Sequence, residues 1–345
     1  MPKISVILPV YNASKYLIEA LESLSNQTFK DFEIIAINDG STDNSLELLQ
    51  DYSKKDQRLR IISRKNKGIT KTLNEGIVLA KGEYIARMDS DDISLPQRFE
   101  KQLNFMSINN LDVCGTQYER FGTKIGFSKM PINCKDCYYR LLLGTTMAHP
   151  SILIKKSVIE KYMYNESIKY AQDYDLWCRM ALDKINMGNT NEVLLKYRFS
   201  SDQISSAKNI LQITYAQSTG KIYWQNSNLV KDLSYPYCVI DSLNNNYKDL
   251  KRTINSLIEL HNRIKQSDYM RKFILSLQRG LILRLSVYGL NSLLPLLKRI
   301  PDLNNKYKYF YSLIALTRAM IIKEKIKRII PSNLRTIISN ILYNK

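Results

Sequence analysis

Alternation of short apolar runs with longer amphipathic stretches over the first hundred residues is the feature that most constrains the fold of this chain. Short, mainly apolar runs lie at 4–10, 32–37, 59–62 and 84–88, the first of them rich in β-branched residues, and the stretches between them carry leucines at helical spacing. A strand, a helix of about ten residues or more and another strand require a right-handed crossover and parallel pairing. The pattern predicts an α/β fold with a mostly parallel central sheet flanked by helices.

The pattern is more mixed beyond about residue 110. Three further strands and one helix are predicted, at 113–118, 151–154, 192–197 and 174–182. Beyond about residue 202, leucine, isoleucine and tyrosine recur at helical spacing with lysine and arginine between them. We therefore expect an α/β domain over residues 1–205 and a basic, mainly helical region over residues 206–345.

Polar side chains lie directly after the carboxyl ends of three of the first four predicted strands. Tyr11 and Asn12 follow the first strand, Asp39 follows the second, and the acidic segment Asp89–Asp92 follows the fourth. In open parallel sheets, ligands bind outside the carboxyl ends of the strands. The sequence therefore predicts a binding site at this edge of the sheet.

The acidic segment has two interpretations. Carboxylates gathered at one strand end repel each other unless a cation neutralises them, and hard oxygen ligands suit Mg2+ or Mn2+, which usually share substrate phosphates. A solvated turn with helix-capping aspartates explains the same residues without a ligand. No glycine-rich phosphate loop follows the first strand. A bound nucleotide would therefore be held by a metal on its diphosphate and by side chains at its base.

Four segments carry a resemblance to a known family. They are ISVILPVYN at 4–12, NDGSTD at 38–43, KGEYIA at 81–86 and DSDD at 89–92. In order and spacing they resemble the family 2 glycosyltransferases, and HPS at 149–151 and QDYDLW at 172–177 extend the likeness more loosely to about residue 205. The resemblance implies a GT-A nucleotide-diphospho-sugar transferase fold, with a nucleotide-binding half over 1–110 and an acceptor half over 111–205. It also implies inversion at the anomeric carbon.

The resemblance implies roles for donor-binding residues. Pro9 and Tyr11 would border the nucleobase, and Asp39 would accept a hydrogen bond from a base N–H. Asp89 would lie beside the ribose and the metal, and Asp91 would be the principal ligand of Mn2+ or Mg2+.

The resemblance also implies roles in the acceptor half. Asp173 matches the position of the catalytic base, and inversion needs a base opposite the leaving diphosphate to take the acceptor's proton. His149 would belong to the acceptor pocket, although a plain turn residue before proline is an equal alternative. The acid that commonly precedes the base is replaced here by Gln172, and Leu73 stands where many members have arginine. Contacts to the diphosphate are therefore less well defined than contacts to the base and the metal.

Charge is distributed unevenly along the 345 residues. The formal net charge is +19, and residues 201–345 carry 23 Lys and Arg against 8 Asp and Glu. A basic surface attracts nucleic acid, an anionic membrane or an anionic ligand, and charge alone does not choose between them. Segment 312–330 alternates apolar and basic residues at helical spacing, which favours a helix on a membrane surface. A packed helical subdomain with a solvated basic face is the alternative.

The sequence gives no sign of secretion or of a membrane-spanning segment. The first apolar run is short and interrupted by Pro9, and no uncharged apolar run reaches the roughly 18–20 residues of a spanning helix. Five scattered cysteines form no disulfide framework, which favours a reducing compartment. We expect a cytoplasmic protein, peripheral on the cytosolic face of the inner membrane.

Resemblance and charge together predict a metal-dependent inverting glycosyltransferase that moves a hexose, galactose or glucose, from a UDP-sugar to a polyprenyl-diphosphate-linked sugar. This is the chemistry of O-antigen, lipopolysaccharide and other polysaccharide repeat-unit synthesis. A rhamnosyl- or N-acetylhexosaminyl-transferase of the same fold is the alternative enzyme. A nucleic-acid-binding protein that uses the basic tail is the alternative of another class. Acidic strand ends and the lack of a recognisable motif argue against nucleic acid as a partner.

Overall fold

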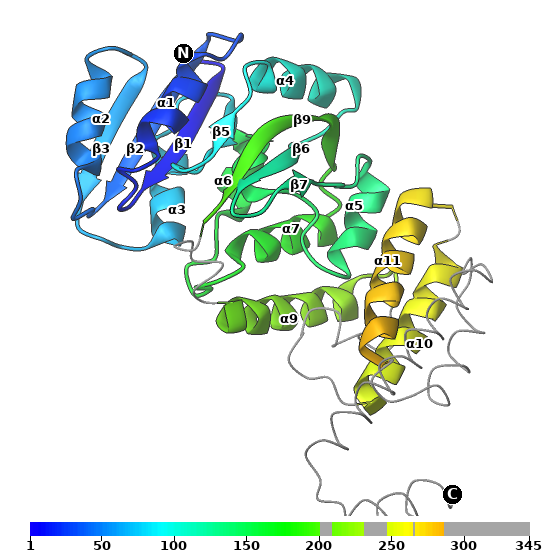
Figure 1. Cartoon of the computed structure of the whole chain (residues 1–345). Coiled ribbons are helices and arrows are strands. Elements are labelled where there is room, and N and C mark those ends of the chain that lie inside the picture. The colour runs from blue at the N-terminus through cyan, green and yellow to red at the C-terminus, as the bar shows by residue number, and fades with distance from the viewer. Residues whose placement is uncertain (201–208, 231–246, 265, 286–345) are drawn as a thin grey trace, which may run out of the picture. The chain divides into compact units, whose positions relative to one another are not determined.

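A computed structural model describes residues 1–200, 209–230, 247–264 and 266–285 of the chain (Figure 1). The chain divides into two compact units, residues 1–231 and 232–345. That the catalytic domain ends near residue 205 stays a prediction. Segment 312–330, for which a membrane-surface helix was predicted, lies outside the described residues.

One nine-stranded sheet forms the core of the first unit. Its strands are β1 (Ile4–Val10), β2 (Phe32–Asp39), β3 (Leu59–Arg64), β4 (Tyr84–Arg87), β5 (Ile93–Ser94), β6 (Val113–Gly122), β7 (Gly126–Phe127), β8 (Leu153–Lys155) and β9 (Met187–Phe199). Their order in space is β3-β2-β1-β4-β8-β6-β9-β5, and β7 pairs with β6. Strands β3, β2, β1 and β4 run parallel, as the sequence pattern predicts, with Val6 opposite both Ile34 and Ala86.

Helices cover both faces of this sheet (Figure 1). In the first unit they are α1 (Leu17–Ser25), α2 (Ser45–Ser53), α3 (Ile69–Leu79), α4 (Arg98–Ile108), α5 (Cys134–Leu141), α6 (Lys156–Tyr162), α7 (Gln172–Leu182) and α9 (Asn209–Asn226). Val6 and Leu8 of β1 belong to one buried cluster with Leu21 of α1. On the other face Ile7 meets Gly76 of α3, where a Cβ would lie 2.6 Å from Ile7 Cγ2. Burial on both faces explains why β1 is apolar at every position except Ser5.

The described part of the second unit consists of α10 (Tyr247–Arg263) and α11 (Asp268–Leu285). These helices bury apolar side chains, among them Leu257 and Ile274. The helical character predicted for the carboxyl-terminal region is therefore confirmed for these described segments. None of the helices in the described ranges is long and apolar enough to cross a bilayer.

The second half of the sheet departs from a simple parallel order. Strand β8 pairs antiparallel with both β4 and β6, and a 3-10 turn at His149–Ser151 delays its start to Leu153. Strand β9 has thirteen residues and begins at Met187, well before the predicted residue 192. It continues along β6 past register shifts on either side of Gln117. Such irregularities leave no clear alternation in the sequence, which is why the prediction found only the end of this strand.

Candidate active site

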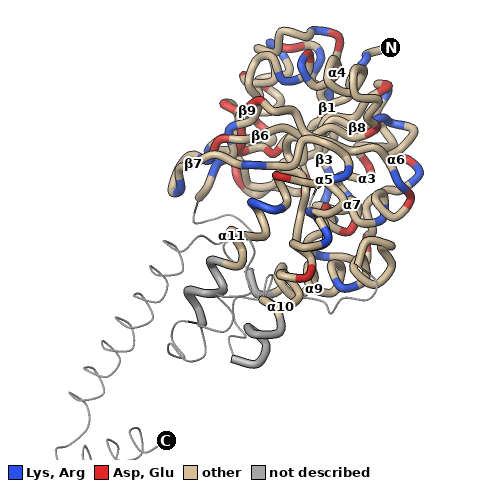
Figure 2. Tube along the Cα trace, turned by 90° about the vertical axis from the view of Figure 1, so that its right-hand side faces the viewer, with Lys and Arg blue, Asp and Glu red and all other residues tan. Residues whose placement is uncertain are grey.

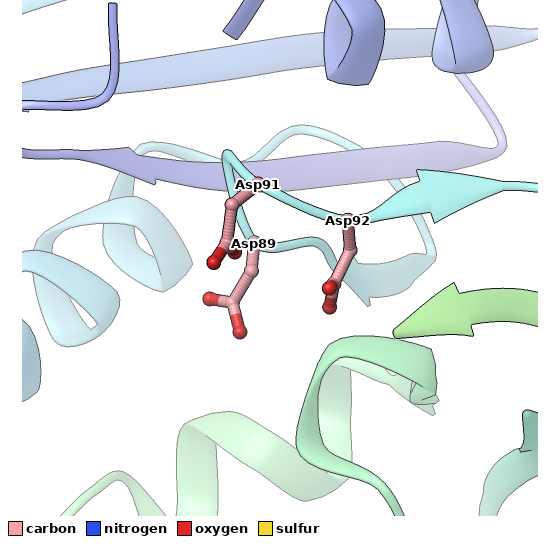
Figure 3. A group of neighbouring side chains, drawn as sticks. All are labelled: Asp89, Asp91 and Asp92. Atoms are coloured by element: carbon pink, nitrogen blue, oxygen red, sulfur yellow. The ribbon is translucent and has the colours of Figure 1, made fainter. Parts of the chain in front are cut away.

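The chain between β4 and β5 brings three aspartates together. Asp89, Asp91 and Asp92 each offer a carboxylate oxygen, and these oxygens lie within 4.8 Å of one another. Figure 3 shows all three side chains projecting from one loop to the same side, with the carboxylates of Asp89 and Asp91 together. β4 hydrogen-bonds beside β1 as far as Met88, whose N–H donates to the Ile7 carbonyl, so the aspartates begin where the ladder ends. The predicted carboxylate cluster at this strand end is therefore present in the structure.

Arg87, the last residue of β4, holds Asp89. Its guanidinium is buried and pairs with both carboxylate oxygens, with Nη1 2.6 Å from Oδ2. Bidentate pairing of this kind fixes the orientation of a carboxylate as well as its charge. Burial raises the pKa of Asp89 to about 6, because lost hydration, with the nearby Asp91 and Asp173 carboxylates, outweighs the stabilising charge of Arg87.

Asp92 ties the acidic loop to β9. Its Oδ1 accepts a hydrogen bond of 2.8 Å from the Arg198 N–H, whereas its buried Oδ2 has no hydrogen-bond partner. Burial and the neighbouring Asp89 and Asp91 raise the pKa of Asp92 well above its usual range. The Arg198 side chain returns to the same loop, where Nε donates to the Asp91 carbonyl at 2.7 Å. Asp92 thus positions the loop, and its unpartnered oxygen leaves the cluster in need of a cation or a proton.

Asp173 lies in the first turn of α7, and its negative charge contributes to the raised pKa of Asp89. Burial raises the pKa of Asp173, although the Tyr174 N–H at the helix N-terminus and the charge of Arg87 oppose the shift. Ala171, directly before the helix, has a left-handed backbone with φ 58°, which costs an alanine on the order of 1 kcal/mol. A strained turn therefore precedes the helix that carries the predicted base.

Asp175, two residues further along α7, does not share this position. Its carboxylate pairs with Arg179 at 2.8 Å, and that guanidinium also binds the carbonyls of Tyr162 and Met163. Asp175 thus fixes the segment that leads into α7.

His149 is buried rather than open to solvent. Its Nε2 lies 2.7 Å from the Tyr164 hydroxyl, and its ring packs against Tyr164 and edge-on against Trp177. Burial, and secondarily the charge of Arg87, hold the pKa of His149 well below its usual range, so the ring is neutral at pH 7. His149 therefore supports Tyr164 in this structure, and acceptor binding by His149 stays a prediction.

Tyr164 also lines a cavity of about 660 Å³. The cavity lies between α3 and the segment before α7. Its other lining residues are Lys67, Lys71, Asn74, Glu75, Val78, Met163 and Glu166. Asn74 fixes this wall, because its Nδ2 donates to the Tyr164 carbonyl at 3.0 Å and its Oδ1 accepts from the Tyr164 N–H at 2.9 Å.

The predicted nucleobase-binding residues lie at the ends of β1 and β2. Pro9 is buried in β1, and Tyr11, 54% exposed, follows the strand. The parallel register that places Val10 opposite Asn38 makes Tyr11 and Asp39 neighbours across the two strands. The structure therefore brings the three predicted base contacts to one edge of the sheet.

Asp39 is already engaged by the protein. Its Oδ1 pairs with Arg64 and accepts a 2.8 Å hydrogen bond from the Lys67 N–H, and its Oδ2 accepts one of 2.9 Å from the Gly68 N–H. These bonds hold the turn that opens α3. A carboxylate oxygen has two lone pairs, so Oδ2 can still accept a further hydrogen bond.

Comparison with known proteins places this site in a family. The family model described as glycosyl transferase family 2 matches residues 5–163. An uncharacterized glycosyltransferase of Methanocaldococcus jannaschii is 32% identical over 234 residues, which is 65% of this chain and 80% of the relative. The chain belongs to glycosyltransferase family 2 and is a glycosyltransferase.

Solved structures show the same fold. Staphylococcus aureus TarS 1-349 in complex with UDP-GlcNAc matches with a TM-score of 0.54 and 17% identity over 92% of each chain. The mannosyltransferase PcManGT of Pyrobaculum calidifontis in complex with GDP-Man and Mn2+ matches with a TM-score of 0.52 and 13% identity, over 92% of this chain and 87% of its own. The predicted GT-A fold is therefore confirmed.

Sequence reasoning missed the arginines that organise the site. No role was predicted for Arg87. A single arginine in a buried strand directly before an acidic cluster nevertheless indicates a paired charge, because arginine is rarely buried without a partner. Arg98, fully buried, donates to the carbonyls of Arg87 and Ile152 at 2.8 and 3.2 Å. Burial and the charge of Arg87 lower the pKa of Arg98 to about 9. Nothing in the sequence around Arg98 indicates that its side chain binds the strand before the acidic loop.

Proposed function

We propose that this glycosyltransferase is metal-dependent and inverting, and that it moves a hexose, galactose or glucose, from a UDP-sugar to a sugar on a polyprenyl diphosphate. The proposal places it on the cytosolic face of the inner membrane, in O-antigen or related polysaccharide repeat-unit synthesis. The observation that carries it is the carboxylate cluster of the acidic loop Asp89–Asp92, together with the buried Asp173, whose charge acts on Asp89. A base and a diphosphate-binding loop facing each other are what inverting transfer requires.

The donor nucleotide is proposed to lie across the carboxyl ends of β1 and β2. Tyr11 offers an exposed aromatic face beside Pro9, and Asp39 Oδ2 keeps one acceptor position for a base N–H. The complex of TarS with UDP-GlcNAc supports a UDP-sugar in this fold.

The acidic loop fits a divalent ion. Its ligands are hard carboxylate oxygens, and the buried Asp92 Oδ2 has no hydrogen-bond partner. Asp91 and Asp89 would hold Mn2+ or Mg2+, with Asp89 turning from Arg87 to do so. A divalent ion bound there would stabilise the charge that develops on the leaving diphosphate. The mannosyltransferase complex with GDP-Man and Mn2+ supports such an ion in this fold.

The chain's own residues carry the remaining steps. Asp173 accepts the proton of the acceptor hydroxyl as that oxygen attacks the anomeric carbon from the face opposite the diphosphate. The raised pKa suits this task, because a more basic carboxylate takes the proton more readily. The positive charge of Arg87 acts on both Asp89 and Asp173. His149 acts on the acceptor side through Tyr164.

A donor panel tests the proposal. The full chain is incubated with Mn2+, a synthetic diphosphate-lipid acceptor sugar and labelled UDP-galactose, UDP-glucose, UDP-GlcNAc or dTDP-rhamnose. Transfer from one of the two UDP-hexoses, lost with EDTA, is the expected result. Transfer from UDP-GlcNAc or dTDP-rhamnose instead would assign the alternative enzyme classes.

Two controls complete the panel. Asp91→Asn should lower the Mn2+-dependent part of UDP affinity by about 100-fold, because it removes the principal ligand, whereas Asp51→Asn on the exposed face of α2 should not. Tight oligonucleotide binding at physiological salt without any transfer would favour the nucleic-acid alternative.

A further inference from the structure

The end of β6, the turn at 123–125 and β7 form a hairpin, here named the 119–129 hairpin. Figure 2 shows the β7 segment projecting from the edge of the first unit. Two large apolar side chains are unusually exposed on it, Ile125 at 86% and Phe127 at 67%. Neither takes part in the active site described above, so their exposure needs a separate explanation.

The hairpin is held firmly at its base. Tyr118 and Ser128 exchange two hydrogen bonds, of 2.7 Å from the Tyr118 N–H to Oγ and of 2.8 Å from the Ser128 N–H to the Tyr118 carbonyl. At the β9 side, Gly122 has φ 89°, and a Cβ there would lie 2.4 Å from the Phe199 carbonyl oxygen. The Thr123 N–H donates to that same oxygen at 2.9 Å. The exposed residues are thus presented by a braced hairpin.

The charge of the hairpin is mainly positive. Residues 119–129 contain three basic residues, Arg120, Lys124 and Lys129, and one acidic residue, Glu119. A second copy of the hairpin would bring like charges together, which disfavours self-association. Apolar side chains projecting among lysines are typical of elements that lie in the interface of an anionic bilayer. We propose that the 119–129 hairpin inserts Ile125 and Phe127 into an anionic membrane surface.

The hairpin root contacts the active site. The Phe121 ring lies 4.3 Å from the Arg198 guanidinium, and Arg198 Nε donates to the Asp91 carbonyl at 2.7 Å. A bilayer bound by the hairpin therefore lies on the side of the unit next to the acidic loop. If the acceptor is a lipid-linked sugar, which rests on the proposed function, its head group would approach from that bilayer.

Tryptophan fluorescence tests insertion directly. The chain has two tryptophans, Trp177 and Trp224, and both are buried. Full-length Phe127→Trp is mixed with vesicles of brominated phosphatidylglycerol or brominated phosphatidylcholine. The matched control is Ile108→Trp, at a position 73% exposed at the end of α4. We expect brominated phosphatidylglycerol to quench the fluorescence of Phe127→Trp well above that of wild type. The fluorescence of Ile108→Trp should not change.

Vesicle flotation gives the second measurement. The double variant Ile125→Ser with Phe127→Ser should bind phosphatidylglycerol vesicles at least about tenfold more weakly, because two apolar side chains no longer leave water. Ile108→Ser should bind as wild type does. The proposal would be overturned if the chain bound vesicles while the fluorescence of Phe127→Trp stayed unquenched. It would also be overturned if the chain did not bind vesicles, or if it formed a dimer that required the hairpin.

Failure of the proposed function has a different signature. Transfer to a short-chain, water-soluble acceptor should be unchanged in the double variant, because its residues lie outside the active site. Normal transfer without insertion would overturn only the membrane proposal. Insertion without transfer to any acceptor would overturn only the proposed function.

Discussion

The ends of β2 and β4 carry aspartates at the same edge of the sheet, yet their surroundings differ. At the end of β2, Asp39 is satisfied by Arg64 and by the N–H groups of Lys67 and Gly68. At the end of β4, three carboxylates lie together, and Asp92 retains a buried oxygen without a hydrogen bond. At the end of β2, Arg64 pairs with the one carboxylate, whereas at the end of β4 three carboxylates lie beside the Arg87 guanidinium. The difference supports the proposal that the acidic loop holds a cation, whereas the Asp39 carboxylate also holds the turn that opens α3.

The largest effect is expected at the residue facing the acidic loop. Asp173→Asn should lower transfer by about 1,000-fold, because an amide cannot take the acceptor's proton. Donor affinity, measured by calorimetry, should stay within a few fold of wild type, since the change lies on the acceptor side. Near-normal turnover would remove Asp173 from its role as base and would weaken the distinction between the two strand ends.

A large loss of stability is expected when the acidic loop loses its arginine. Arg87→Gln leaves the Asp89 carboxylate buried without its partner, which should lower the free energy of unfolding in urea by about 3 kcal/mol. The double variant Arg87→Gln with Asp89→Asn should recover part of that loss. Lys54→Gln, which breaks an exposed pair with Asp51, should leave the free energy of unfolding nearly unchanged, because solvent screens such a pair. Equal effects of Arg87→Gln and Lys54→Gln would contradict this interpretation of the loop.

A smaller loss is expected at the end of β2. Asp39→Asn weakens the ion pair with Arg64 and turns an amide group toward backbone donors, which should lower the free energy of unfolding by about 2 kcal/mol. Donor affinity should fall as well, while the Mn2+ dependence of transfer should stay as in wild type. A changed Mn2+ dependence would show that the two strand ends do not have separate roles.

The mildest effect is expected from pH. Burial raises the pKa of Asp173, so its carboxyl keeps its proton to a higher pH than an exposed aspartate does. The base form is lost as pH falls through this pKa, and transfer at saturating Mn2+ should drop about tenfold per pH unit below it. The acid limb should lie at a higher pH than the pKa of an exposed aspartate, and Asp39→Asn should not move it. An acid limb at the value of an exposed aspartate would contradict the raised pKa.

The first four strands and the acidic loop could be predicted from sequence because each depends on local information. Strand β1 is apolar except for Ser5 since both its faces are covered, and the aspartates lie within four consecutive residues of the chain. The contact between Arg198 and the Asp91 carbonyl could not be predicted, because it joins residues 107 positions apart. The same holds for the pairing of Asn74 with Tyr164, and for the antiparallel insertion of β8 between β4 and β6.

The central claim is that a divalent ion held by Asp91 bridges the protein and a nucleotide's diphosphate. Crystals grown with UDP and Mn2+ and measured at the manganese absorption edge test it most directly. The account predicts an anomalous peak between an Asp91 carboxylate oxygen and the UDP phosphates, lost in Asp91→Asn crystals. UDP bound with no peak at Asp91, or a peak unchanged in the variant, would contradict it.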